Sequence, residues 1–258
     1  MFLKKHNIRL RRQLQKAENC MSNSSLVSYI KISPYRTVPR NHKIDTITIH
    51  CMAGNFSVET CGNIFQRVGR NASSNYGIGT DGRVGMYCEE KDRSWCSSNR
   101  DNDHRAITIE VANDGGAETG WHISDKAMET LIALCADICK RNNIAKLVWS
   151  DKKADRVGHK NGVNMTCHRD FAAKACPGDY IYSKEGYIAS EVNKLLGAKE
   201  KPVETPNTSA EQYHVVVKGD TMSKIARKYG TTLAKLKTLN PQVKDLNKIY
   251  AGQKIRVR

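Results

Sequence analysis

The chain has 258 residues, 39% of them hydrophobic, which is enough for one sizeable domain and a small second one. No stretch approaches the roughly 18 apolar residues of a membrane span, and the basic N-terminus lacks the apolar run of a secretory signal. The net charge of +16 is uneven, because residues 212–258 hold eleven Lys or Arg against two acids, whereas 21–211 hold 25 against 23. A basic tail on a nearly neutral body predicts an anionic partner for the tail, either nucleic acid or a cell wall.

The first segment is also basic, with six Lys or Arg and one acid in residues 1–20, and we interpret 1–30 as an N-terminal arm. Short runs rich in β-branched residues follow it. TITIH (46–50), AITIEV (106–111) and LVW (147–149) are typical of buried strands. These runs predict the strands of one central sheet.

Turn and helix signals lie between those strands. TDGR (80–83) is flanked by two short apolar runs and predicts a hairpin. Ser57 and Ser124 stand where each can cap a following helix, and a third helix is expected near 183–196. Helices interleaved with strands and a hairpin predict an α/β domain over 31–196, with a central mixed sheet flanked by helices.

The sequence at the end of the chain predicts a linker and a second, smaller domain. Residues 197–211 are rich in Pro, Thr, Ser, Glu and Lys and have almost nothing to bury, which indicates a flexible linker. Residues 212–258 show strand, helix, helix and strand signals in that order. They predict a small βααβ module, which packing alone must hold because it contains no cysteine.

Three residues could ligate a metal. His50 ends a predicted strand, and His168 and Cys176 lie in an irregular segment closed by Cys-Pro-Gly. Two imidazoles and one thiolate leave the fourth tetrahedral position of zinc open for water, as in catalytic sites. Spacing alone leaves another interpretation open, in which His50 is a core histidine and Cys176 a buried thiol. The neighbouring Cys51 and Cys167 should point away from the metal if the backbone there is extended.

Four segments carry a resemblance to a known family: ITIHCMAG, SSNYGIGTDGRVG, AITIEV and CHRDFAAKACPGDY, in that order. Over residues 31–196 the chain resembles the zinc-dependent N-acetylmuramoyl-L-alanine amidases, which include phage lysozyme-type amidases and peptidoglycan recognition proteins. The most specific match is His-x5-Lys-x-Cys-Pro, which here begins at His168. The resemblance implies Zn²⁺ held by His50, His168 and Cys176.

The same resemblance implies three catalytic residues. Tyr76 matches the tyrosine before the central hairpin, and Lys174 matches the lysine two residues before the cysteine ligand. Glu110 matches a glutamate that many members carry at the end of the strand written here as ITIEV. Amide hydrolysis needs an activated water, a stabilised oxyanion and a proton for the leaving amine. Lys174 and Tyr76 would donate hydrogen bonds to the oxyanion, and Glu110 would carry the proton.

Residues 212–258 resemble the LysM module, through YHVVVKGDTMSKIARKYG, a Leu-Asn-Pro segment and IYAGQKIRV. Such modules bind glycans that contain N-acetylglucosamine, in a groove between the loop after the first strand and the loop before the last. A simple turn and helix cap in the first loop is the alternative. The residues that match the groove are Gly219, Asp220, Thr221, Met222, Ile249 and Tyr250.

These features predict a hydrolase that cuts between N-acetylmuramic acid and L-alanine, held on peptidoglycan by its tail. We expect a monomer that acts on the bacterial cell wall and, without a signal peptide, leaves the cytoplasm by a phage holin-type route. The alternative is a non-catalytic peptidoglycan-recognition protein, but such proteins typically lack the cysteine that Cys176 supplies. A nucleic-acid binder is disfavoured, because the chain has few aromatic residues and no basic helix interleaved with aromatics.

Overall fold

The computed structural model describes residues 23–197 and 213–257, apart from 218, 230, 244 and 247. The chain divides into two compact units, Met1–Lys199 and Glu200–Arg258. Most of the predicted arm and nearly all of the predicted linker lie outside the described residues. Among the described residues, no helix has both the length and the apolar character needed to cross a membrane.

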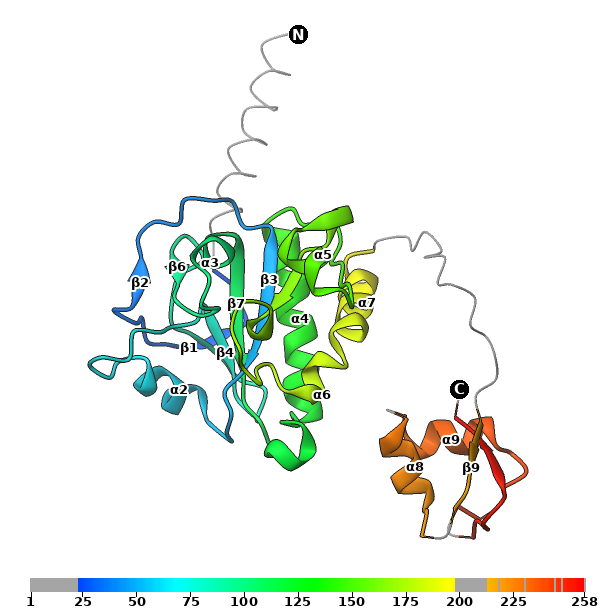
Figure 1. Ribbon diagram of the computed structural model, residues 1–258. Helices are drawn as coiled ribbons and strands as arrows, with labels where there is room; N and C mark the ends of the chain where they lie inside the picture. The colour runs from blue at the N-terminus through cyan, green and yellow to red at the C-terminus, as the bar shows by residue number, and fades with distance from the viewer. Residues whose placement is uncertain are drawn as a thin grey trace, which may run out of the picture. The chain divides into compact units, whose positions relative to one another are not determined.

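The larger unit is built on a six-stranded sheet with the order β1-β5-β4-β7-β3-β8 (Figure 1). At its centre, β3 pairs in parallel with β7 and with β8, and β7 pairs in parallel with β4. The hairpin predicted at TDGR is confirmed, because β4 and β5 are antiparallel. The sheet is therefore mixed, as predicted. Its strands are β1 (Val27–Ile30), β3 (Thr46–Cys51), β4 (Tyr76–Ile78), β5 (Val84–Met86), β7 (Ala106–Val111) and β8 (Met165–Cys167), and β2 (Arg36–Thr37) and β6 (Arg93–Ser94) form a separate pair.

The prediction of a strand at 147–149 is wrong, because these residues form no strand in the structure. The Leu147 amide donates to Asn193 Oδ1 and the Val148 amide to Asn164 Oδ1, both at 2.8 Å. Asn193 Nδ2 also donates to the Leu147 carbonyl. Because side-chain amides satisfy these backbone groups, the segment needs no neighbouring strand. The edge beyond β3 is instead formed by β8, which the apolar pattern did not reveal.

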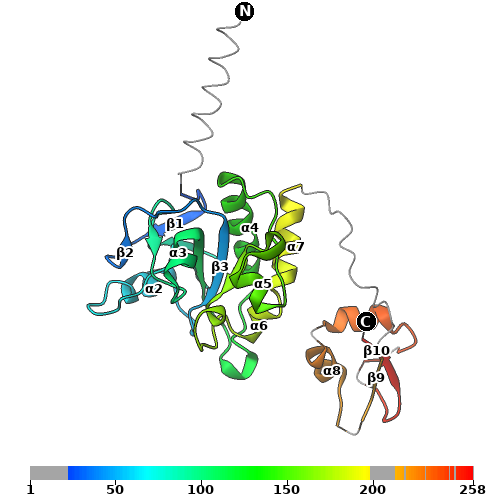
Figure 2. The same cartoon turned by 45° about the horizontal axis from the view of Figure 1, so that its top comes forward.

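Helices α4 and α7 lie side by side and cover one face of the sheet (Figures 1 and 2). The predicted caps are confirmed: Ser57 Oγ accepts the Thr60 amide and Ser124 Oγ accepts the Ala127 amide. Helix α3 packs against β6 and β7, and α2 against β1, β4 and β5. The helices in the described part of this unit are α2 (Val58–Ile64), α3 (Arg100–Arg105), α4 (Asp125–Arg141), α5 (Lys153–Val157), α6 (Asp179–Tyr182) and α7 (Glu185–Leu195).

The two faces of the central strands differ in chemistry. Ile49 and Ile109 belong to the main core together with Leu131 and Leu134 of α4. Alternate residues face the other way. Among them, Thr48 Oγ1 contacts Thr166 Oγ1 at 2.8 Å and accepts a hydrogen bond from Asn102 Nδ2 of α3. This second, polar face is the one that carries His50 and Glu110.

The smaller unit has the predicted βααβ order. Its two strands pair antiparallel, and its core is a single cluster of buried apolar side chains around Ile225, Leu236 and Ile255. The elements are β9 (Tyr213–Val215), α8 (Met222–Lys228), α9 (Leu233–Leu239) and β10 (Lys254–Arg256).

Glu185, at the start of α7, is fully buried, and neither of its carboxylate oxygens has a hydrogen-bond partner. Burial raises the pKa of this carboxyl well above its usual range, and the negative charge of Asp170 adds to the shift. The folded chain therefore keeps a proton that the unfolded chain releases near pH 4.3. Stability should fall as pH rises above that value, by up to about 1.4 kcal/mol per pH unit from this group.

We expect Glu185→Gln to remove this contribution, since an amide carries no titratable proton. Urea unfolding at pH 5 and pH 8 measures it. The variant should gain stability relative to the natural chain as the pH rises. Parallel pH profiles for the two proteins would show that Glu185 does not titrate in this way.

Candidate metal centre and cleft

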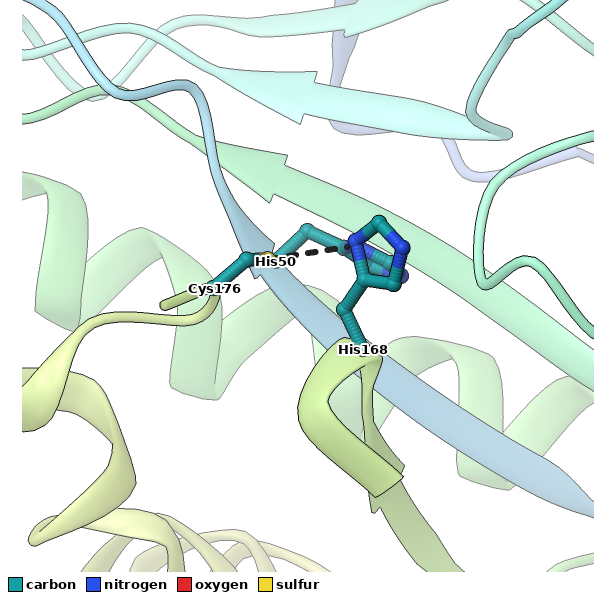
Figure 3. A group of neighbouring side chains, drawn as sticks. All are labelled: His50, His168 and Cys176. Atoms are coloured by element: carbon teal, nitrogen blue, oxygen red, sulfur yellow. Dashed lines mark hydrogen bonds between the residues drawn. The ribbon is translucent and has the colours of Figure 1, made fainter. Parts of the chain in front are cut away.

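The structure brings His50, His168 and Cys176 together at one edge of the sheet (Figure 3). His50 lies near the carboxyl end of β3, and His168 directly follows β8, which pairs with β3 in parallel. Parallel neighbours end at the same edge, so the topology itself places the two imidazoles side by side. Their ring centroids are 5.1 Å apart, and one ligand atom from each of the three residues lies within 4.8 Å of the others.

The donor set fits a zinc ion. His50 Nδ1 and Cys176 Sγ are 3.4 Å apart. Bond lengths of about 2.1 Å to nitrogen and 2.3 Å to sulfur put two tetrahedral ligands of one zinc roughly 3.6 Å apart. His168 Nε2 lies 3.0 Å from Ser98 Oγ, which leaves Nδ1 of that ring for a metal and resembles the outer hydrogen bond of ligating histidines.

The protonation states of the two imidazoles also suit metal binding. Burial lowers the pKa of His50 to about 3, and the neighbouring His168 adds to that effect. Burial lowers the pKa of His168 too, with the charge of Lys174 contributing. Both rings are therefore neutral at pH 7, which is the form that binds metals.

A buried ion pair holds the turn that carries His168. Arg156 donates two hydrogen bonds to Asp170 Oδ1 and one to Oδ2, at 2.6 to 3.1 Å, and both side chains are almost fully buried. Asp170 Oδ2 also accepts the Cys167 amide at 3.0 Å. This pair fixes the chain on both sides of His168.

Replacing Arg156 by alanine should destabilise the larger unit by about 3–5 kcal/mol, because the Asp170 carboxylate would stay buried without its partner. The free energy of unfolding in urea measures this. Arg83→Ala is the matched control, since Arg83 pairs with Glu59 at 2.7 Å on the surface and should contribute less than about 1 kcal/mol. Equal effects of the two substitutions would contradict this ranking.

The chain that follows Cys176 packs closely against the segment around Trp121, which helps to fix the position of Cys176. Gly178 has φ +85°, and a Cβ there would lie 2.6 Å from Trp121 Cβ. The residue before the helix α6 must therefore be glycine. The Arg169 amide donates to the Cys176 carbonyl, and the Cys51 amide donates to Cys176 Sγ at 3.4 Å.

Glu110 is the direct neighbour of His50 across β3 and β7. Its Oε2 is buried without a hydrogen-bond partner, and its Oε1 accepts a weak hydrogen bond from Cys96 Sγ at 3.8 Å. Burial raises the pKa of Glu110 to about 8, and Cys51 contributes to the shift. A carboxyl with such a pKa can both accept and donate a proton near neutral pH.

His168 and Cys176, two of the three candidate ligands, line an open cleft of two adjoining hollows, of about 390 and 410 Å³. Glu110, Lys174, His168 and Arg70 line both hollows. The structure therefore brings Lys174 and Glu110 to the same cleft as His168 and Cys176. A larger hollow of about 990 Å³, near the start of β3, contains none of the candidate residues.

The structure corrects the prediction for Tyr76. Tyr76 pairs with Ile109, whose side chain faces the opposite side of the sheet from Glu110, so Tyr76 also faces away from the cleft. Its ring is fully buried in the main core. Its hydroxyl donates to Glu90 Oε1 at 2.7 Å and accepts the Ser24 amide at 2.9 Å. We therefore assign Tyr76 a structural role.

Tyr76→Phe should consequently destabilise the fold and leave turnover unchanged. Removing the hydroxyl leaves Glu90 and the Ser24 amide short of a partner, which costs about 1–3 kcal/mol. Urea unfolding and initial rates on purified cell wall test the two parts. A large fall in rate at unchanged stability would restore the catalytic interpretation.

Several residues of the cleft were not predicted from the sequence. Arg70, Cys96 and Ser98 come from loops, and no spacing pattern links them to the ligands. Cys51 was expected to point away from the metal. It belongs to no metal-capable group among the described residues, but it lines the cleft, and its backbone amide donates to Cys176 Sγ. Cys51 is the last residue of β3, and at the end of a strand a side chain on either face of the sheet can reach the cleft.

The eight described cysteines are all free.

In the smaller unit, the residues predicted to contact glycan differ in their exposure and in the hydrogen bonds they form. Met222 is buried at 2% exposure within the core of the module, so it cannot present its side chain to a glycan, and that prediction is wrong. Thr221 Oγ1 accepts the Lys224 amide and so caps α8. Asp220 accepts the Val217 amide and lies 2.7 Å from His214 Nε2. Tyr250 is 70% exposed, and Gly219 has φ +93°.

Comparison with known proteins agrees with this geometry. Residues 40–179, more than half of the chain, match the N-acetylmuramoyl-L-alanine amidase family. The chain belongs to this family. Residues 214–258 match the LysM domain.

Individual relatives cover only parts of the chain. An endolysin of Bacillus phage B103 is 54% identical over 52 residues, which are 20% of each protein. The probable N-acetylmuramoyl-L-alanine amidase AmiB of Haemophilus influenzae is 33% identical over 48% of this chain and 27% of its own length. The amidase XlyB of Bacillus subtilis is 34% identical over 35% of this chain and 28% of its own length. The chain thus spans about a fifth to a quarter of these relatives.

Among solved structures, a mutant endolysin from Bacillus subtilis is 16% identical and aligns over 64% of this chain and 97% of its own, with a TM-score of 0.47.

Proposed function

We propose that this protein is a zinc-dependent N-acetylmuramoyl-L-alanine amidase that hydrolyses the amide between N-acetylmuramic acid and L-alanine in peptidoglycan. The observation that carries the proposal is the grouping of two neutral imidazoles and a thiol within 4.8 Å, beside a buried carboxyl and a lysine in one open cleft. Membership of the amidase family supports the substrate class.

A zinc ion bound by His50, His168 and Cys176 would supply an activated water and polarise the scissile carbonyl. Glu110 would accept a proton at its carboxylate from the attacking water and return it to the leaving nitrogen, which its pKa near 8 permits. Lys174, which lines the same cleft, would donate a hydrogen bond to the oxyanion that develops on the carbonyl.

The smaller unit supports a second part of the proposal. Its match to LysM and its excess of basic residues suit a module that binds wall glycan and keeps the catalytic unit close to its polymeric substrate. Gly219, Asp220, Thr221, Ile249 and Tyr250 remain the proposed glycan contacts. Of these, Tyr250 is the most exposed aromatic side chain of this unit and the best placed to stack on a sugar.

We further propose an endolysin-like role, in which a monomer acts on the cell wall after release by a holin-type route. The similarity to a phage endolysin supports this.

The test is the release of new free amino groups from purified peptidoglycan by the zinc-loaded protein. Amino groups should appear with the loaded chain and not after removal of the metal by a chelator. No release from the loaded protein would reject the enzymatic function and favour a recognition role.

A further inference from the structure

A fourth potential ligand, Cys96, lies beside Glu110. It belongs to the segment after β6, and its backbone is fixed by Asp103, which accepts the Cys96 amide at 3.0 Å and the Ser97 amide at 3.0 Å. The Cys96 thiol points to Glu110 Oε1 at 3.8 Å. No step of the proposed reaction uses this thiol.

Cys96 and Glu110 form a second metal-capable group with His50. One ligand atom from each of the three lies within 4.8 Å of the other two. Imidazole, thiolate and carboxylate are all ligands of zinc, and the thiolate also favours softer ions such as Cd²⁺. Only His50 is shared with the first group.

Two unpartnered polar atoms point independently to a ligand in this place. His50 is 1% exposed, and its Nε2 has no hydrogen-bond partner, while its Nδ1 faces Cys176. Glu110 Oε2 is also buried and without a partner. Buried polar atoms are normally satisfied, so each exception needs an explanation. A cation bound beside His50 and Glu110 would satisfy both atoms.

We propose that His50, Cys96 and Glu110 form a second metal position, which takes a thiophilic divalent cation while the first position is filled. His50 serves both positions, because its two ring nitrogens lie on different sides of the ring. Binding there releases the Cys96 thiol proton and the remaining ring N–H proton of His50 to solvent, and a proton held by the Glu110 carboxyl leaves with them. The ion also engages the carboxylate of Glu110, so excess metal inhibits hydrolysis. This last consequence rests on the proposed function.

The test is equilibrium dialysis of the full chain against rising Cd²⁺, with bound metal counted by mass spectrometry and thiolate-to-metal absorption recorded in the ultraviolet. The natural chain should bind two equivalents in two steps, each adding absorption from one thiolate. Cys96→Ala should bind one equivalent, with the affinity of the first step changed less than about threefold. Cys61→Ala is the matched control, because Cys61 lines the same cleft but belongs to neither group, and it should bind two.

One equivalent in the natural chain, or two in Cys96→Ala, would overturn the proposal. If Cys96→Ala fails to fold by circular dichroism, Glu110→Gln gives a second test, in which the second step should weaken at least about tenfold while the first is kept. Unchanged second-step binding in Glu110→Gln would equally overturn it. These measurements do not depend on activity, so a chain that binds two equivalents but cleaves no peptidoglycan would refute the proposed function alone.

Discussion

Cys176→Ala should remove both the metal and the activity. The thiolate is one of three proposed protein ligands, and loss of a mere outer-shell partner already lowers metal affinity about 10–100-fold, so loss of a ligand should exceed that range. Amide hydrolysis should fall with the bound zinc. Metal content after dialysis and initial rates on purified wall measure the two effects.

Cys61→Ala is a suitable control for this substitution. Cys61 lines the same cleft and is also buried, but it belongs to no metal-capable group among the described residues. It should keep its zinc and its rate. If Cys176→Ala retained stoichiometric zinc and full activity, the assignment of the metal centre would be wrong.

Glu110→Gln should lower kcat by about 10²–10⁴ while the protein keeps the zinc held by His50, His168 and Cys176. The amide has nearly the same shape as the carboxyl but cannot take up and return a proton. Rates on a soluble peptidoglycan fragment, together with the zinc content, separate the chemical step from metal loss.

Glu59→Gln is the matched control, because Glu59 is an exposed carboxylate on α2 that pairs with Arg83. Its kcat should stay within about twofold of the natural value. A Glu110→Gln protein with normal kcat would show that another group moves the proton.

The grouping of His50, His168 and Cys176 could be predicted because the motifs that carry the family resemblance are local and follow one another in a fixed order. The supporting residues depend on how strands pair. That Glu110 lies beside His50 follows from the parallel register of β3 and β7, which no local pattern reports. Cys96 and Ser98 reach the site from a loop, so only the tertiary fold brings them there.

The predictions for Tyr76 and Met222 were wrong for the same physical reason, which is that a sequence motif does not say where a side chain points; the strand predicted at LVW failed for a different one. Tyr76 lies on β4 next to Gly77, which pairs with Glu110 of the cleft. Because side chains alternate along a strand, that of Tyr76 points into the main core instead. Met222 belongs to the motif of the glycan loop, yet as the first residue of α8 it packs inward. LVW has strand propensity, but side-chain amides satisfy its backbone.

The central claim is the identity of the bond that is cut, and mass spectrometry of peptidoglycan digested by the zinc-loaded chain tests it most directly. Digestion should release stem peptides that begin with a free L-alanine amino group, together with glycan strands whose N-acetylmuramic acid has lost its peptide. Fragments cut within the stem peptide or within the glycan strand, with the lactyl–alanine amide intact, would contradict it.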